Sequence, residues 1–466
     1  MNTVIANNIR VTDPSSQLMK WAKDNLILPN PEYVKKTRMG FWTGRTPQTL
    51  SLYETHGKTL ILPFGVLRAT LPLLQNDPIQ TAFHIGESVP YECEIPLYEY
   101  QKDAVKAMIK AKYGMLQSAA GSGKTQMGIA LIQSWGTRAL WLCHTADLLT
   151  QSRERAERYM DKSLLGTITE GKVNLGRGIT FATIQTMCNL DLTQYRDYWD
   201  VIIVDEAHRV SGSPTQMTRY FKVLNNLSAR HKYGLTATPD RSDGLIKATH
   251  ALLGDVVYIV PDEAVADKIM KVGVKAVATG VGLSEDCLNP DGTLNYTGMI
   301  SYLCDDFRRT GVIASHIIAE AGHSCLILSD RLEHLETLMN RLPTDMRKQA
   351  VMITGKMVSK KGKAEREESI EQMRTGEKRF MFATYSLCKE GLDIPRLDRL
   401  FMATPVKYNA TVIQSIGRIA RIFEGKEAPI AYDFVDNGIP YCVKAYKERC
   451  RHYKRVGAYF AGGESG

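Results

Sequence analysis

The chain has 466 residues, a length for which two or three domains are expected, because a single hydrophobic core rarely grows that large. Its 44% apolar and 23% charged residues are typical of an ordinary globular protein. No stretch approaches the ~18 consecutive apolar residues of a membrane span, and the N-terminus lacks the basic start and apolar middle of a secretory signal. We therefore expect a cytoplasmic protein without a membrane partner.

The net charge of +9 favours a polyanionic partner, although many basic proteins bind no nucleic acid. The nine cysteines are scattered singly along the chain, without any CxxC pair. This spacing is typical of reduced thiols and argues against a zinc site or a disulfide framework.

Residues 1–92 carry no recognisable catalytic pattern. Their sequence predicts a helix around Ser16–Asn25 and two short strands, Leu50–Tyr53 and Thr59–Leu62, separated by the turn signal His56-Gly57. We expect a small N-terminal α+β domain whose segment 30–47 is rich in basic and aromatic residues.

From about residue 95 onward, short apolar runs alternate with stretches of helical pattern, which indicates parallel sheets with crossover helices. The first series of runs comprises Gly114–Ser118, Ala139–His144, Ile179–Thr183, Val201–Val204 and Tyr233–Leu235. The second comprises Ser324–Leu328, Ala350–Ile353, Phe380–Ala383, Leu400–Ala403 and Ile430–Phe434. The predicted fold class is α/β, with two tandem lobes over 93–278 and 311–458, a connection over 279–310, and a flexible tail or tag remnant over 459–466.

The segment SAAGSGKT, Ser118–Thr125, follows an apolar run and precedes an amphipathic stretch, which is the setting of a phosphate-binding loop. Glycines permit the tight turns of such a loop, and the N–H groups at the start of the next helix attract an anion. Lys124 would bind the β- and γ-phosphates of ATP, and Thr125 would hold Mg²⁺. The residues expected to line the loop are Ala120, Gly121, Ser122, Gly123, Lys124 and Thr125. Because Ser118 replaces the first glycine of GxxxxGK[ST], a glycine-rich surface turn stays open for this segment alone.

A second apolar strand ends in two acids at VIIVDEAH, Val201–His208. Ligands of open α/β folds bind at the carboxyl edge of the sheet, where these acids would lie. Asp205 is expected to serve Mg²⁺ and Glu206 to orient the attacking water. Acids after a strand often only compensate a helix dipole, but beside a phosphate loop they indicate ATP hydrolysis.

These segments resemble those of superfamily 2 helicases of the DEAH type, and the resemblance spans about 95–435. It implies two RecA-like lobes that form an ATP-driven motor, and in this family the first glycine of the loop is commonly replaced. The resemblance assigns Gln101 to adenine. It further implies backbone contacts to nucleic acid from His144, Thr183 and Gln185, and coupling of the nucleotide site to that surface through His208, Thr236 and Thr238.

The second lobe carries the remaining segments of the resemblance. Thr354 and Thr384 would contact the nucleic-acid backbone, while Gly391 and Asp393 would lie at the nucleotide interface. QSIGRIAR, Gln414–Arg421, is similar to the family's QxxGRxxR segment. Arg418 and Arg421 lie three residues apart and are expected to share one helix face, from which they would reach the γ-phosphate as arginine fingers. A solvated basic helix face is the alternative for two arginines taken alone.

Within the superfamily, GLTATPDRSDG (Gly234–Gly244) and the IGRIAR form of the last segment resemble the XPB/UvsW branch more than the DEAD-box RNA helicases. NPEY and LILPFG in the N-terminal region resemble phage branch-migration helicases, including those of T5-type phages. This implies 3′→5′ remodelling of branched or forked DNA in recombination, replication and repair: Holliday-junction migration, fork reversal and D- or R-loop unwinding. A phage-encoded protein would work in the cytoplasm of its bacterial host. The sequence is compatible with a monomer and does not reveal whether the chain has protein partners.

Two basic segments have two interpretations each. In the first, Lys35, Lys36 and Arg38, with Arg45, would hold DNA phosphates while Phe41 or Trp42 stacks on an unpaired base; alternatively the aromatics form the domain core and the basic residues are a solvated face. The second segment, Lys444–Arg455, is either a further duplex contact or a solvated helix face.

Three rival functions stay open. A duplex-DNA translocase subunit that does not separate strands would carry the same motifs, and so would an RNA helicase. A non-motor module that holds branched DNA with an idle nucleotide site is disfavoured, because Lys124, Asp205, Glu206 and Arg421 are all present.

Overall fold

The computed structural model describes residues 2–74, 78–83, 86–119, 121–213, 218–237, 245–265, 269–355, 357, 360–389, 392–406 and 409–461. The chain divides into two compact units. The first comprises residues 1–119 and 123–261, and the second comprises 262–466 with the short stretch 120–122. Within the described part of the chain, no helix is both long and apolar enough to cross a membrane.

The N-terminal region contains the predicted α+β domain. Its five-stranded sheet has the order β5-β6-β2-β1-β7. The strands are β1 (Asn2–Ile5), β2 (Asn8–Thr12), β5 (Glu54–His56), β6 (Thr59–Pro63) and β7 (Ile79–Thr81), and the helices are α1 (Ser16–Asn25) and α3 (Leu67–Thr70). Along β2, Ile9 and Val11 are buried while Arg10 and Thr12 are exposed, so one face of the sheet packs on α1. The predicted helix over 16–25 and strand over 59–62 are confirmed.

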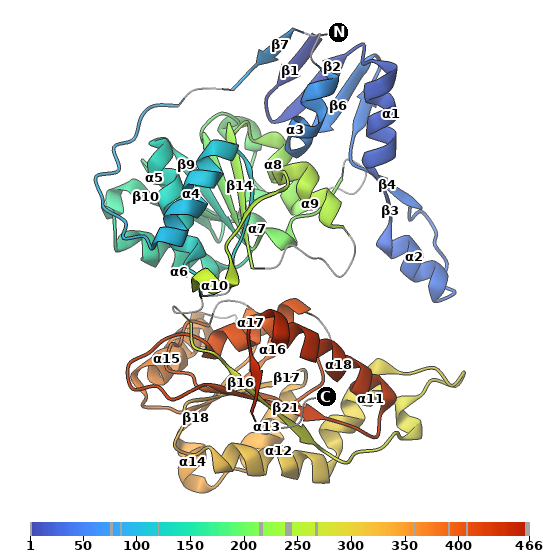
Figure 1. Ribbon diagram of the computed structural model, residues 1–466, viewed down its shortest axis with the longest axis vertical. Helices are drawn as coiled ribbons and strands as arrows, with labels where there is room; N and C mark the ends of the chain where they lie inside the picture. The colour runs from blue at the N-terminus through green and yellow to red at the C-terminus, as the bar shows by residue number, and fades with distance from the viewer. Residues whose placement is uncertain are drawn as a thin grey trace. The chain divides into compact units, whose positions relative to one another are not determined.

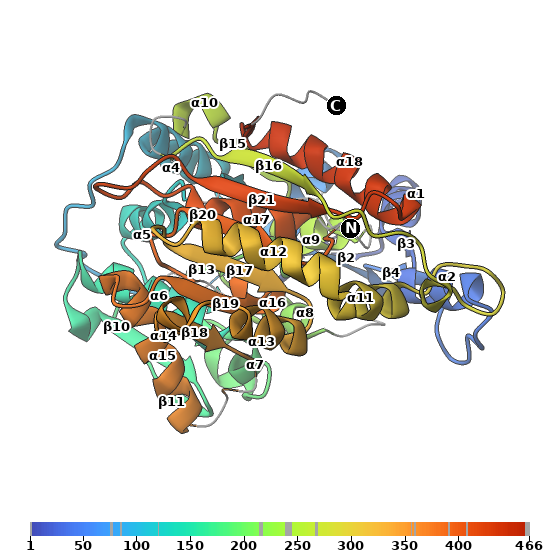
Figure 2. The same ribbon diagram turned by 90° about the horizontal axis from the view of Figure 1, so that it is seen from below.

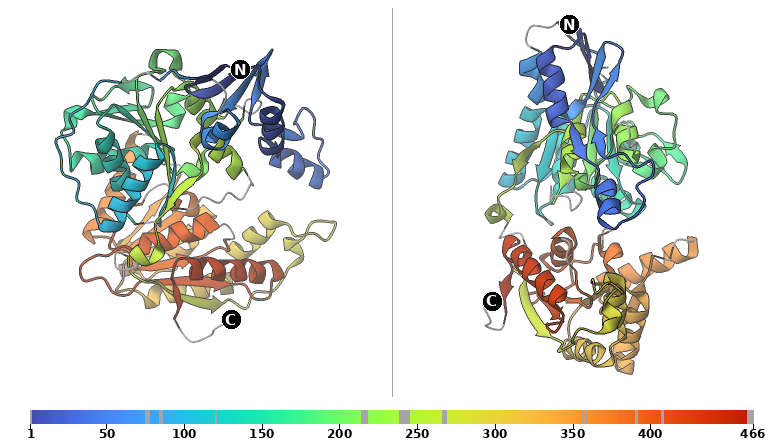
Figure 3. Two further views of the ribbon diagram at one scale, coloured as in Figure 1. Left: turned by 45° about the horizontal axis from the view of Figure 1, so that its top comes forward. Right: turned by 90° about the vertical axis from the view of Figure 1, so that its right-hand side faces the viewer.

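An arm leaves this domain between β3 (Ile27–Pro29) and β4 (Thr49–Ser51), which form a separate two-stranded sheet. The arm contains α2 (Pro31–Arg38), none of whose residues is buried. Figures 1 and 3 show the arm extending away from the five-stranded sheet. The predicted strand over 50–53 is confirmed only in part, because β4 begins one residue earlier and ends at Ser51.

The N-terminal domain is packed firmly against the rest of the first unit. A Cβ built at Gly65 would lie 2.2 Å from the carbonyl oxygen of His250, so only glycine permits this approach of two backbones. Tyr113 and Ala251 belong to the same hydrophobic core as the N-terminal strands, and the Arg68 amide donates to the Tyr113 hydroxyl at 2.7 Å. The domain is therefore a fixed part of the first unit.

The first unit is built on an eight-stranded sheet of order β11-β10-β12-β9-β13-β14-β8-β15 (Figure 1). All neighbours are parallel except β10 and β11. The strands are β8 (Gly114–Gln117), β9 (Ala139–Cys143), β10 (Leu165–Thr169), β11 (Lys172–Asn174), β12 (Ile179–Thr183), β13 (Val201–Asp205), β14 (His231–Thr236) and β15 (Val256–Ile259). The helices are α4 (Glu99–Ala111), α5 (Lys124–Trp135), α6 (Ala146–Glu157), α7 (Ile184–Met187), α8 (Arg219–Asn226) and α9 (Ile246–Leu253). The central strands are buried on both faces, as their continuous apolar runs predict.

The second unit repeats this architecture with a seven-stranded parallel sheet of order β18-β19-β17-β20-β21-β16-β22, seen in Figure 2. The strands are β16 (Gly273–Ala278), β17 (Cys325–Ser329), β18 (Ala350–Ile353), β19 (Phe380–Thr384), β20 (Arg399–Met402), β21 (Ile430–Val435) and β22 (Tyr459–Phe460). The helices are α10 (Asp262–Val265), α11 (Tyr296–Asp305), α12 (Phe307–Ala319), α13 (Leu332–Asn340), α14 (Thr344–Lys348), α15 (Lys360–Thr375), α16 (Tyr385–Lys389), α17 (Asn409–Ile419) and α18 (Pro440–Arg455).

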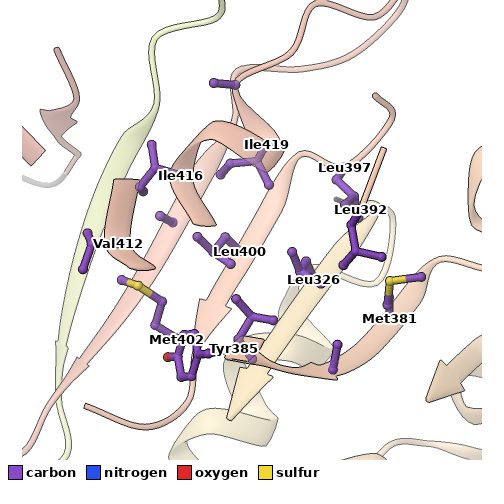
Figure 4. Packing of buried hydrophobic residues seen from close by; sticks show 14 of the residues in the cluster. Leu326, Met381, Tyr385, Leu392, Leu397, Leu400, Met402, Val412, Ile416 and Ile419 are labelled. Atoms are coloured by element: carbon purple, nitrogen blue, oxygen red, sulfur yellow. The ribbon is translucent and has the colours of Figure 1, made fainter. Parts of the chain in front are cut away.

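The core on one side of this sheet fixes the position of α17. Val412, Ile416 and Ile419 of that helix pack in one cluster with Leu400 and Met402 of β20 (Figure 4). These apolar side chains recur at helical spacing, so α17 turns one face to the sheet and carries its polar residues on the other faces.

The structure confirms the fold class but differs from the predicted boundaries in three places. Residues 273–278 were assigned to the first lobe, whereas β16 pairs with β21 in the second sheet. The expected connection over 279–310 packs into the second unit, because Met299 and Leu303 share a core with Cys442 of α18. The expected tail begins too early, since β22 pairs with β16. The remaining boundaries stay a prediction.

Candidate nucleotide and nucleic-acid sites

The phosphate-loop segment joins β8 to α5 at the carboxyl edge of the first sheet. Gly121 and Gly123 have φ angles of 85° and 82°, in the left-handed region where a side chain would be strained. Lys124 begins α5, and its ammonium donates to the carbonyl oxygens of Ser118 and Ala119 at 3.1 Å each. The loop therefore curls around its own lysine, the geometry in which a lysine and a helix N-terminus both serve an anion.

Gln101 lies against this loop from α4. The side chain is 1% exposed, its Oε1 accepts from the Tyr98 amide at 3.0 Å, and its Nε2 donates to the Tyr100 hydroxyl at 3.4 Å. A Cβ at Gly123 would lie 2.4 Å from Nε2, so the glycine makes room for the glutamine. The structure thus brings the predicted adenine reader to the phosphate loop.

The acidic pair ends β13, two strands from β8 in the same sheet. Asp205 is 7% exposed, and its Oδ1 accepts from the Glu206 amide at 3.0 Å. Burial and the neighbouring Glu206 carboxylate raise the pKa of Asp205, while the Lys124 ammonium opposes that rise. Burial also favours a higher pKa for Glu206, but the bond from His208 and the charge of Lys124 outweigh it and lower its pKa. Because Lys124 acts on both acids, the three charged groups form one cluster.

His208 links this cluster to the end of β14. Its Nδ1 lies 3.2 Å from Glu206 Oε2 and 3.2 Å from the hydroxyl of Thr236, which is fully buried. Glu206 itself adopts a left-handed φ of 52°, a strained conformation for a residue with a side chain. Of the predicted coupling residues, His208 therefore contacts the Glu206 carboxylate directly, and Thr236 contacts His208.

The segments that come directly after the neighbouring strands β9 and β12 contain the predicted nucleic-acid contacts of the first unit. Gln185 Nε2 donates to the His144 carbonyl at 2.6 Å, which joins the two predicted backbone-contact segments. Thr183 is 5% exposed and its hydroxyl donates to Thr186 at 3.0 Å, so its side chain is engaged within the fold. Burial, then Arg209 and Arg219, lower the pKa of His144 to about 4. Sequence reasoning missed these two arginines; the only signal was that Arg209 directly follows DEAH.

In the second unit, the predicted backbone contacts lie at the ends of adjacent strands. Thr354 follows β18 and Thr384 ends β19, and these strands are parallel neighbours. The Thr384 hydroxyl lies 2.9 Å from that of Ser386. Both threonines are only partly buried, so the carboxyl edge of this sheet presents two hydroxyl side chains.

The arginine segment differs from its prediction. Arg418 and Arg421 were expected on one helix face, but α17 ends at Ile419 and Arg421 lies beyond it. The helix stops because the chain turns into an extended pairing: Ile269 bridges Arg421, and the Met270 amide donates to the Ala420 carbonyl at 2.6 Å.

The two arginine side chains reach a common loop. Arg418 Nη1 donates to the Leu392 carbonyl at 2.9 Å, and the guanidinium of Arg421 forms an ion pair with Asp393. Gln414 is 8% exposed, and its Oε1 is buried without a hydrogen-bond donor among the described residues. The structure therefore places the side chains of Arg418 and Arg421 on the loop that contains Leu392 and Asp393, while the roles of these residues and of Gln414 at the nucleotide stay a prediction.

Lys426 holds the end of α17, a role that the sequence did not suggest. Its ammonium donates to the carbonyl oxygens of Ile419 and Arg421 at 2.7 Å each and of Pro395 at 3.1 Å. Carbonyls at a helix C-terminus lack intrahelical donors and attract a cation. Lys426 thus ties the main chain of Arg421 to the helix and to the loop that carries Asp393, although burial lowers its pKa to about 8.

The residues around the phosphate loop fit ATP with Mg²⁺. Mg²⁺ takes oxygen ligands, and the Asp205 carboxylate with the partly buried Thr125 hydroxyl offers them beside a lysine suited to phosphate. Three predicted site residues, Ala120, Thr238 and Gly391, lie outside the described residues.

The N-terminal residues that were predicted to contact DNA lie on the arm. Lys35 and Arg38 are exposed on α2, whereas Lys36 is tied to Glu32 at 2.7 Å and to the Thr46 hydroxyl at 2.7 Å. Trp42 is 88% exposed. Of the two interpretations, the one that placed Phe41 and Trp42 in the domain core is wrong.

Comparison with known proteins gives two family matches. Residues 94–241 match the family "Type III restriction enzyme, res subunit", and residues 310–423 match "Helicase conserved C-terminal domain". Together they cover more than half of the chain.

Two relatives and one solved structure are similar to most of the chain. "Probable helicase D10" of Escherichia phage T5 is 25% identical over 348 residues, 74% of this chain and 71% of the relative. "DNA 3'-5' translocase XPB2" of Sulfurisphaera tokodaii is 26% identical over 375 residues, 74% and 83% of the two chains. The structure of S. cerevisiae Dbp5 bound to RNA and ADP BeF3 covers 86% of this chain and 94% of its own, with a TM-score of 0.55 and 14% identity.

Proposed function

The chain belongs to the superfamily 2 helicases and is a nucleic-acid-dependent ATPase, and from that premise we propose that it is a DNA motor that remodels branched DNA with 3′→5′ polarity. The substrates would be Holliday junctions, stalled forks and D- or R-loops, in recombination, replication and repair. The DNA assignment and the polarity are supported by the name of the archaeal relative, a DNA 3'-5' translocase. The phage relative supports a role in phage DNA metabolism.

The observation that carries the proposal is a linked set of interactions: the charge of Lys124 acts on Glu206, and His208 contacts both Glu206 and Thr236. In the proposed reaction, Lys124 and the loop amides would bind the phosphates, and Asp205 with Thr125 would hold Mg²⁺, which would supply charge neutralisation there. Glu206, kept ionised by His208, accepts the proton of the attacking water. Since His208 also contacts Thr236, a change at Glu206 reaches the end of β14 directly.

The second unit would serve the same turnover. Arg418 and Arg421 would stabilise charge that develops on the γ-phosphate, with Gln414 and Asp393 orienting them. Nucleic-acid contacts would come from His144, Gln185 and the main chain at Thr183 in the first unit, and from Thr354 and Thr384 in the second. These are contacts to phosphate and sugar, so binding should weaken steeply with salt and show little sequence preference.

The test is ATP hydrolysis without nucleic acid and with single-stranded DNA, plain duplex, a fork, a four-way junction and RNA. We expect the strongest stimulation from the branched DNAs, with branch-migrated products on a native gel, and none of these products from Lys124→Ala. Equal stimulation by plain duplex, without strand separation, would instead identify a duplex translocase. Stimulation by RNA alone would overturn the DNA assignment.

A further inference from the structure

The arm between β3 and β4 displays apolar side chains where a soluble surface ordinarily has few. Among the described residues, a third of the exposed large apolar side chains fall within residues 27–42 of the arm: Ile27, Val34, Met39, Phe41 and Trp42. Phe41 is 64% exposed and Trp42 is 88% exposed. Such a concentration on one small element marks a binding surface, because scattered single residues are the norm elsewhere.

Hydrogen bonds join the outgoing and returning sides of the arm. Asn30 is 2% exposed at its base, where its Oδ1 accepts from the Glu32 amide at 3.0 Å and its Nδ2 donates to the Pro47 carbonyl at 2.8 Å. Its amide also donates to the Gln48 carbonyl at 3.0 Å. Near the tip, Lys36 bridges α2 to Thr46. One buried asparagine and one lysine therefore tie α2 to the segment that returns to β4.

The indole of Trp42 lies against Gly44 on one side. A Cβ built at Gly44 would be 3.0 to 3.2 Å from three carbons of the six-membered ring, and Gly44 has a φ of 51°. The backbone thus supports the ring, while its high exposure leaves most of its surface to solvent. Beside it, a hollow of about 280 Å³ is lined by α2 and the loop 42–47. A supported aromatic ring with an open face is the geometry of a base-stacking platform.

The charges of the arm complement a polyanion. Its single acid, Glu32, is paired with Lys36 at 2.7 Å, which leaves Lys35, Arg38 and Arg45 exposed around the aromatic tip. Aromatic rings interleaved with basic side chains bind bases and phosphates of unpaired nucleic acid at the same time. An apolar protein partner would not require the excess of three positive charges.

We propose that the arm binds the branch point of DNA, with Trp42 stacking on the first unpaired base and Lys35, Arg38 and Arg45 holding the adjacent phosphates. The inference rests on the proposed function and deepens it, because it names the feature that would distinguish a branch from plain duplex. Since the N-terminal domain is packed against the motor sheet through Gly65 and Tyr113, the platform moves with the first unit. A base held there is unavailable for re-pairing while the motor advances.

The test uses the full-length protein without ATP and a fork that carries 2-aminopurine at its first unpaired position. Wild type should change the 2-aminopurine fluorescence, and Trp42→Ala should abolish that change and weaken fork binding about tenfold, with plain-duplex binding unaltered. Trp42→Phe should retain most of the signal, because a ring remains. Phe307→Ala is the matched control, since Phe307 is a 76% exposed aromatic in the second unit. Arg45→Ala should lower the salt dependence of fork binding by about one phosphate contact.

Two results would overturn the inference. One is an unchanged 2-aminopurine signal in a folded Trp42→Ala protein, and the other is an equal loss of affinity for plain duplex. Either result leaves the proposed function standing if branched DNA still stimulates ATP turnover. Conversely, intact Trp42-dependent stacking without any DNA-stimulated turnover would reject the motor function and retain the platform as a binding site.

Discussion

Lys232 offers a sharp test of how the N-terminal domain is held on the first unit. The side chain is fully buried in β14, and its ammonium donates to the Leu224 carbonyl at 2.7 Å and the Asn7 carbonyl at 3.4 Å. The ring of Phe64 lies 5.2 Å away. Burial lowers the pKa of Lys232 from 10.5 to about 7. The perturbation is Lys232→Met, which keeps the length of the side chain and removes its charge and donors.

The sign follows from proton linkage. Between pH 7 and pH 10.5 the unfolded chain holds the proton on Lys232 and the folded chain releases it, so stability rises with pH in this window. Where the unfolded chain holds one full proton more than the folded chain, the free energy of unfolding rises by about 1.4 kcal/mol per pH unit. Because Lys232 titrates only partly at both ends of the window, the total rise between pH 7 and pH 9.5 is roughly 3 kcal/mol. The methionine leaves two carbonyls without their donor, at about 1–3 kcal/mol each. At pH 7 the lowered pKa of Lys232 costs wild type about 4 kcal/mol, which is similar to the cost of the two unpaired carbonyls in the variant. The variant should therefore match wild type at pH 7 and be clearly less stable at pH 9.5.

The assay is denaturant unfolding followed by tryptophan fluorescence at both pH values. All five tryptophans lie in the first unit, so the signal reports this unit alone. Lys58→Met is the control, because its ammonium-bearing side chain is 85% exposed. From pH 7 to pH 9.5, the free energy of unfolding should rise by the same amount in wild type and in Lys58→Met. Lys232→Met should lack this rise. If all three proteins shift in parallel, the buried lysine is not the titrating group and the reasoning fails.

Four substitutions probe the motor. Lys124→Ala should abolish ATP turnover and leave DNA binding largely intact; an active variant would exclude the phosphate-loop assignment, as read by phosphate release and fluorescence anisotropy. Glu206→Gln should bind ATP yet hydrolyse it about 10²–10⁴-fold more slowly, and unchanged turnover would refute its role as base. Arg421→Ala should lower DNA-stimulated kcat by about 10³-fold or more with little change in ATP affinity; full activity would remove it from the catalytic set. Lys426→Met should lower kcat more than it raises KM, because the Arg421 main chain loses the ammonium that holds it. Lys426→Arg should restore part of the rate. If Lys426→Met changes only Tm, Lys426 is only a helix cap.

Strand prediction succeeded where burial dominates. The apolar runs over Val201–Val204 and Phe380–Ala383 became buried strands because both faces of a parallel sheet are covered. The missed strands β15 and β16 lie toward one end of their sheets and are only partly buried. Lys275 interrupts the apolar pattern of β16, whereas β15 is a short apolar run, VVYI, that the sequence analysis did not single out. Their pairing is decided by long-range neighbours, which a local pattern does not contain.

The nucleotide site was predictable because its chemistry restricts residue types at fixed spacing. Glycines with positive φ, a lysine at a helix start and acids at a strand end leave few alternatives. The position of Arg421 was not predictable in this way. Helical spacing from Arg418 suggested a shared face, but the chain leaves the helix to form a bridge with Ile269, which is distant in sequence.

The basic segment Lys444–Arg455 shows why residue type without periodicity misleads. Both interpretations treated its cations as one group, yet Arg449 of α18 is 1% exposed and forms hydrogen bonds of 2.8 Å from two of its nitrogens to the two Asp433 oxygens. The buried positions of the helix, Cys442, Ala445, Arg449 and Tyr453, recur every three or four residues. The exposed cations fall between them, so a helical projection would have separated a core arginine from a solvated face. Arg449→Ala should therefore destabilise the second unit through an unpaired buried Asp433, whereas any DNA contact of α18 can involve only its exposed lysines and arginines.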